Sequence, residues 1–138
     1  MGDTVTIGEK LGKLKEYYEE FVEWSNISYE EFIRNTKDKR SLEKQMEIII
    51  DTAISINNMI LKIERGETSA EYFNSFINLA EAGVIEMDFA LNIAPSTGLR
   101  NILVHEYQEI DDKKVYDSFK DVKKYYKEYM QFIQKYLK

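Results

Sequence analysis

A long stretch in the middle of the chain repeats apolar residues at alternating steps of four and three positions. Because an α-helix has 3.6 residues per turn, these side chains form one stripe along a helix of about six turns. Gly66 follows the stripe and is a typical helix end. Such a stripe must be buried against other elements, so this segment predicts the central helix of a helical core. Its members are Leu42, Met46, Ile49, Ala53, Ile56, Ile60 and Ile63.

Two further stripes predict long helices near the ends of the chain. One starts at about Lys10 and the other follows Asp111 or Asp112, either of which can cap a helix N-terminus. The inward positions are Leu11, Leu14, Tyr18, Phe21 and Trp24 in the first, and Val115, Phe119, Val122, Tyr126, Tyr129, Ile133 and Tyr136 in the last.

Shorter helices are predicted between the long ones. "SYEE" at Ser28–Glu31 is a capping box that starts a short helix with Phe32 and Ile33 turned inward. Another helix runs from about Ala70 to Gly83. A third begins near Ile85, is broken or kinked at Pro95 and continues through "LRNILVHEY".

The resulting fold class is all-α, an antiparallel four-helix-type bundle with short additional helices. The 138 residues suffice for one domain, and alternating strand patterns of useful length are absent from the sequence. We expect residues 1–9 to form a flexible N-terminal tail and residues 10–138 to form a single helical domain.

The residue inventory limits the classes of function. The sequence has no cysteine and one histidine, which disfavours thiolate and histidine metal sites, although carboxylates could still hold Mg²⁺. We therefore expect no metal and no cofactor. No apolar run approaches the length of a membrane span, so we expect no membrane partner and a cytoplasmic location.

Charge is distributed unevenly along the chain. The net charge is −6, which argues against a general nucleic-acid coat. Residues 1–111 carry 11 basic and 21 acidic side chains, whereas residues 112–138 carry 8 lysines and 4 acids. The last helix could offer a basic strip to a phosphate backbone, but a solvated lysine face is the favoured interpretation.

The stretch "GLRNILVHEYQEID" places Arg100, the single His105 and Tyr107 close together in sequence. On a regular helix, successive residues rotate by about 100°, so Arg100 and His105 lie roughly 140° apart and Arg100 and Tyr107 lie nearly in line. Arg100 and His105 converge if the helix ends or bends near His105, or if a second copy supplies the partner group.

These residue types suit metal-independent RNA cleavage. A histidine can accept and return protons near neutral pH, and an arginine holds phosphate through a planar fork of donors. His105 would deprotonate the 2′-hydroxyl or protonate the leaving oxygen, while Arg100 stabilises charge on the phosphate oxygens. Structural alternatives are that Arg100 pairs with Glu106 or with an acid of a dimer mate, that His105 belongs to a degenerate site, and that Tyr107 only packs.

The motif and its surroundings resemble the HEPN ribonuclease superfamily, specifically the HepT-like toxins. The resemblance extends from about Leu11 to the C-terminus. It rests on "FNSFINLAEAGVI" before the motif, "GLRNILVHEY" at it, "IDDKKVY" after it, and the earlier "TAISINNMIL". Asn58 matches the asparagine of the family's mid-chain helix, whereas Met59 stands where many relatives have histidine.

The resemblance implies a HEPN-like bundle, a homodimer with two Arg-His motifs facing a shared cleft, and an endoribonuclease toxin acting on mRNA or tRNA. It implies a minimal nucleotidyltransferase antitoxin as partner, which transfers AMP to Tyr107. Asn101 fills the motif's polar position and is expected to orient Arg100 or the substrate. The alternative is a non-catalytic HEPN module that binds nucleotide or serves as a scaffold for the nucleotidyltransferase.

Overall fold

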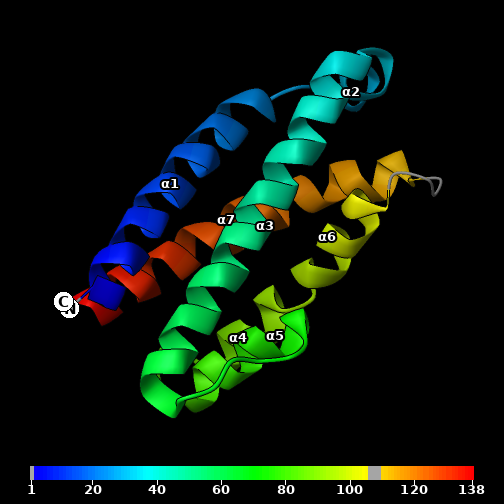
Figure 1. Ribbon diagram of the computed structural model, residues 1–138. Helices are drawn as coiled ribbons and strands as arrows, with labels where there is room; N and C mark the ends of the chain where they lie inside the picture. Colours follow the sequence, from blue (N-terminus) through cyan, green and yellow to red (C-terminus); the bar gives the residue numbers. More distant parts are fainter. Residues whose placement is uncertain (1, 106–109) are drawn as a thin grey trace.

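The computed structural model describes residues 2–105 and 110–138, and all regular secondary structure within them is α-helical (Figure 1). This confirms the predicted fold class. The helices are α1 (Gly2–Trp24), α2 (Tyr29–Arg34), α3 (Thr36–Arg65), α4 (Tyr72–Glu81), α5 (Met87–Ile93), α6 (Ser96–Val104) and α7 (Asp112–Leu137).

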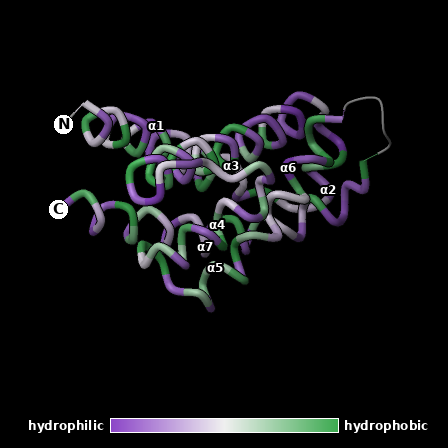
Figure 2. The backbone as a smooth tube through the Cα atoms, turned by 60° about the horizontal axis from the view of Figure 1, so that its bottom comes forward, coloured by the Kyte–Doolittle hydropathy of each residue, from purple (hydrophilic) through white to green (hydrophobic). Residues whose placement is uncertain are grey.

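The long helix α3 is the centre of the bundle. It runs antiparallel to α1 and packs against α1, α2, α4 and α6 (Figure 1). Helix α7 passes behind α3 in this view and packs against α1, α2 and α5. The start of α1 and the end of α7 lie at the same end of the bundle, as Figures 1 and 2 both show.

The predicted stripes form the core, except at helix ends. In α3, every stripe position from Leu42 to Ile60 is buried. Apolar and polar residues alternate along the long helices (Figure 2). The predictions were wrong for Trp24, Ile33 and Ile63, which are 42%, 44% and 40% exposed. Trp24 and Ile63 lie in the last turns of their helices, and α2 is so short that it buries only Phe32 on one face.

The N-terminal segment differs from the flexible tail expected for residues 1–9. Helix α1 begins at Gly2, and Ile7 is fully buried in the core. Ile7 precedes the buried Leu14 by seven residues, so it extends the same stripe by two turns. One apolar anchor is enough to continue an existing helix, because propagation needs no new nucleus.

Side-chain caps fix the starts of α2, α3 and α7, and those of α2 and α7 confirm predictions from the sequence. Ser28 Oγ accepts a hydrogen bond from the Glu31 backbone N–H at 3.1 Å, and Asp111 caps α7 in the same way at 3.2 Å. Asn35 caps α3, which therefore starts six residues before its apolar stripe. Gly66 ends α3 with φ of 77°, the left-handed conformation that glycine adopts without strain.

Among the described residues, no helix combines the length and the apolar character needed to cross a membrane.

Candidate active site

Helix α6 carries Arg100 and Asn101 of the sequence motif, and it is held against the bundle at both ends. Pro95 separates it from α5, as predicted. Its buried residues are Thr97 and Leu103, which lie on either side of Arg100. Because residues three apart share a helix face, Arg100 lies on the side of α6 that packs against α3.

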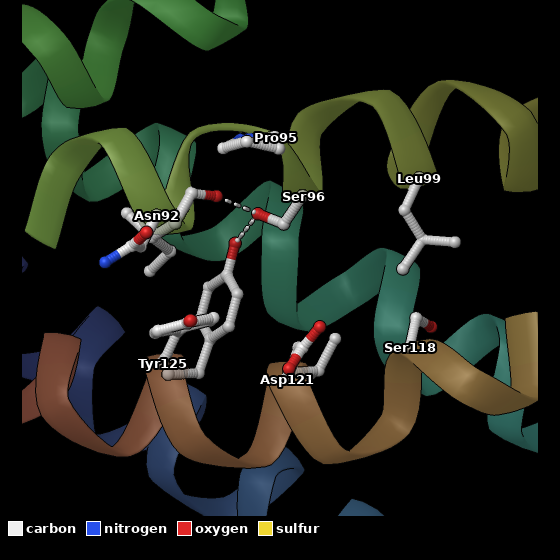
Figure 3. A pocket seen from close by; sticks show the side chains of 10 residues that line it. Asn92, Pro95, Ser96, Leu99, Ser118, Asp121 and Tyr125 are labelled. Carbon is white, nitrogen blue, oxygen red and sulfur yellow. Dashed lines mark hydrogen bonds between the residues drawn. The ribbon is translucent and has the colours of Figure 1, made fainter.

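A hydrogen bond to α7 fixes the start of α6. Ser96 Oγ donates to the Ile93 carbonyl at 2.7 Å and lies 2.7 Å from the Tyr126 hydroxyl (Figure 3). Burial raises the pKa of Tyr126 well above its usual value, so this hydroxyl remains a neutral donor. The bond borders a cavity of about 170 Å³ lined by residues such as Asn92, Leu99 and Asp121.

The guanidinium of Arg100 is held by α3 and α4. Its Nε donates to Asp51 Oδ1 on α3 at 2.6 Å, and its central carbon lies 4.8 Å from the ring centre of Tyr72 on α4. Nη1 also donates to Asn101 Oδ1 at 3.4 Å. The Arg100 side chain is 20% exposed, so the guanidinium is partly shielded but still reaches solvent.

The charge of Arg100 is maintained despite its burial. Burial alone lowers the pKa of the guanidinium, but the hydrogen bond and charge of Asp51 outweigh it and the pKa is raised. Tyr72 and Glu47 act in the same direction. Arg100 is therefore a permanent cation in a partly shielded position.

Sequence reasoning missed Asp51, because its partner is distant in the chain. The alternatives predicted from the sequence pair Arg100 with Glu106, which lies outside the described residues, or with an acid of a dimer mate; within the described residues Arg100 pairs with an acid 49 positions earlier. One signal was available: Asp51 is the only charged residue between Glu47 and Lys62. A single carboxylate within such an apolar stretch of a helix indicates a polar partner on a neighbouring element.

His105 ends α6. Its backbone has φ of −84° and ψ of 75°, so the helix stops at Val104 and the exposed His105 leaves the helical path. This meets one of the two conditions under which Arg100 and His105 can serve the same site. Asn101 is exposed next to Arg100. Tyr107 lies outside the described residues.

Two neighbouring asparagines on α3, Asn57 and Asn58, make structural hydrogen bonds. Asn58 Oδ1 accepts the Ser69 backbone N–H at 3.0 Å and ties the segment before α4 to α3. Asn57 is fully buried and hydrogen-bonded.

Within residues 2–105 and 110–138, no group of three or more His, Cys, Asp or Glu side chains is arranged to hold a metal ion.

The bundle is similar to solved HEPN structures. A tri-AMPylated HEPN toxin of Shewanella oneidensis in complex with an MNT antitoxin matches with a TM-score of 0.82 and 21% identity, covering 93% of this chain and 96% of the other. A toxin–antitoxin structure with AMP-PNP matches with the same TM-score at 20% identity, covering 93% of this chain and 96% of the other. The fold is therefore of the HEPN class.

Sequence comparisons narrow the class to a family. The family described as "Ribonuclease HepT-like" matches residues 7–135. The tRNA nuclease HepT of Aphanizomenon flos-aquae is 31% identical over 135 residues, which are 98% of this chain and 92% of the relative. A putative RNase of Archaeoglobus fulgidus is 35% identical over 74 residues, 54% of this chain and 55% of the relative. The chain belongs to the HepT-like ribonuclease family.

Proposed function

We propose that this ribonuclease is the toxin of a toxin–antitoxin pair and cleaves mRNA or tRNA without a metal ion, using Arg100 and His105. The observation that carries the proposal is a permanently charged Arg100 on the helix that His105 terminates. The curated relative at 31% identity is named a tRNA nuclease, which makes tRNA the first substrate to test.

The reaction uses the substrate's own nucleophile. The 2′-hydroxyl of the RNA attacks the adjacent phosphorus, and the bond to the 5′-oxygen of the next nucleotide breaks. His105 removes the proton from the 2′-hydroxyl or delivers one to the leaving 5′-oxygen. Arg100 stabilises the negative charge that gathers on the non-bridging oxygens. The products carry a cyclic phosphate and a free 5′-hydroxyl.

The proposed assembly is a homodimer that a minimal nucleotidyltransferase antitoxin restrains by transferring AMP to Tyr107. The added phosphate charge and adenosine bulk on Tyr107 would occupy the place of the substrate phosphate and silence the site. The solved HEPN toxin described as tri-AMPylated and in complex with an MNT antitoxin supports this assignment.

The test is cleavage of total tRNA and mRNA in EDTA by the purified chain and by His105→Ala. Intact mass is measured first, so that AMP on the protein is not mistaken for inactivity. Cleavage with cyclic phosphate ends that is lost in the variant is the expected result. Unmodified wild-type protein that leaves both RNA pools intact would overturn the proposal.

A second candidate is a non-catalytic scaffold that binds nucleotide or holds the nucleotidyltransferase. Two observations favour it: the net charge of −6, and the carboxylate of Asp51 that offsets the charge of Arg100. The same experiment separates the candidates, because only the ribonuclease cuts RNA in a His105-dependent way.

A further inference from the structure

We infer that Asp51 and Tyr72 position Arg100 for phosphate binding and thereby set the rate of RNA cleavage. This inference rests on the catalytic role proposed for Arg100. The two residues belong to α3 and α4, so the core of the bundle, and not α6 alone, determines where the guanidinium lies.

The contacts to Asp51 and Tyr72 restrain the guanidinium without using its terminal amino groups, one of which, Nη1, makes only a long 3.4 Å hydrogen bond to the exposed Asn101. Asp51 Oδ1 accepts the hydrogen bond from Nε at 2.6 Å. The Tyr72 ring packs against the guanidinium, with 4.8 Å between the ring centre and Cζ. A bidentate contact to phosphate needs a pair of parallel N–H donors, and Nη1 and Nη2 provide such a pair when Nε is already engaged. The edge bond and the ring together fix the plane in which that pair lies.

The ion pair is poorly suited to a purely structural role. The side chains of Arg100 and Asp51 are 20% and 42% exposed. A partly exposed ion pair contributes little to stability, because solvent screens the attraction and ordering two side chains costs entropy. Helix α6 is already held by the buried Thr97 and Leu103. The Asp51 carboxylate therefore acts mainly on the position and orientation of the Arg100 guanidinium.

The sign of the charge at Asp51 separates positioning from simple substrate attraction. A carboxylate next to Arg100 repels the incoming phosphate, so Asp51 does not improve RNA binding by electrostatics. Removing it leaves substrate affinity unchanged or stronger. A guanidinium that is no longer fixed stabilises the transition state less well, so kcat falls. A loss confined to kcat is the signature of positioning.

The experiment measures initial cleavage rates against concentration of total tRNA for the unmodified homogeneous protein and its variants. We expect Asp51→Ala to lower kcat by about 10- to 100-fold with KM unchanged or lower, since small misplacements of catalytic groups have effects of this order. Asp51→Asn keeps an oxygen acceptor for Nε and recovers part of kcat. Tyr72→Ala lowers kcat by about 3- to 10-fold, whereas Tyr72→Phe keeps the ring and stays near wild type.

The matched control is Glu81→Gln, which removes the carboxylate that pairs with Arg65 at 3.3 Å on another part of the surface. We expect its kcat to stay within about twofold of wild type, as for an exposed ion pair. Arg100→Ala tests the proposed function itself: wild-type cleavage by this variant would overturn the role of Arg100.

If Arg100→Ala is inactive but Asp51→Ala and Asp51→Asn both cleave with wild-type kcat, the positioning role is wrong and the proposed function stands. A fall in kcat matched by an equal rise in KM, or no recovery in Asp51→Asn, would also overturn it. Melting temperatures of all variants identify any loss that comes from unfolding, and a folded Asp51→Ala with wild-type kinetics decides against the inference by itself.

Discussion

Tyr129 on α7 donates its hydroxyl proton to Oδ1 of Asn57 on α3, and both side chains are fully buried. The hydroxyl oxygen of Tyr129 also lies 3.0 Å from the carbonyl oxygen of Ala53. Asn57 Nδ2 in turn donates to Ser75 Oγ on α4 at 3.1 Å, so one polar network joins three helices inside an apolar core. Burial raises the pKa of Tyr129 well above its usual value, which keeps the hydroxyl protonated.

Tyr129→Phe leaves the Asn57 carbonyl oxygen buried without its donor. We expect a loss of about 1–3 kcal/mol in the free energy of unfolding, the usual cost of an unsatisfied buried polar group. Urea denaturation measures it. The control is Tyr136→Phe, which removes a 2.8 Å hydrogen bond to Glu64 at the surface and should cost no more than about 0.5 kcal/mol. Equal losses of unfolding free energy in the two variants would show that the buried network stabilises the protein no more than a surface hydrogen bond does.

Glycine substitutions should act in opposite directions at two positions. Gly66 ends α3 at φ of 77°, so Gly66→Ala forces a Cβ into the left-handed region and should destabilise the protein by about 1 kcal/mol. Gly12 lies inside α1, and a Cβ there meets no atom within 4 Å. Gly12→Ala should therefore stabilise by about 0.5–1 kcal/mol. Thermal melts of both variants test the pair, and a change of the same sign would contradict the helix-end argument.

Glu43 on α3 gives the stability a pH dependence. Burial raises the pKa of its carboxyl above the usual 4.5, with Lys39 and Arg40 opposing and Asp112 reinforcing the shift. The folded state therefore favours the protonated form, and the ionised carboxylate costs stability above the raised pKa. This cost disappears as the pH falls through the raised pKa toward 4.5.

Glu43→Gln should accordingly melt at a higher temperature than wild type at pH 7, and the difference should vanish near pH 4. The gain is small, because the side chain is only half-buried. Melting curves between pH 4 and pH 8 provide the measurement, with the exposed Glu67→Gln as the control. A difference in melting temperature that grows as the pH falls would be opposite to the expected direction. It would rule out burial of Glu43 as the cause.

The sequence predicted the helices well because their signals are local. The stripe of α3, the caps at Ser28 and Asp111 and the break at Pro95 depend on residues within a few positions of one another. Burial at helix ends depends on where the neighbouring helices stop, so the exposed Trp24 could not be predicted. The same holds for the site: the motif identifies Arg100, but its partner Asp51 is a tertiary contact.

Arg100→Lys tests whether the planar shape of the guanidinium matters as well as its charge. A lysine ammonium keeps the positive charge but cannot hold Asp51 with one edge while presenting a parallel pair of donors to phosphate. We therefore expect kcat for RNA cleavage to fall by about 100- to 1,000-fold, the usual effect of losing a transition-state donor. The matched control is Arg65→Lys, whose arginine pairs with Glu81 at the surface and should leave kcat unchanged. Full activity in Arg100→Lys would mean that the site needs only a point charge, because a lysine cannot reproduce the edge bond that Nε makes to Asp51.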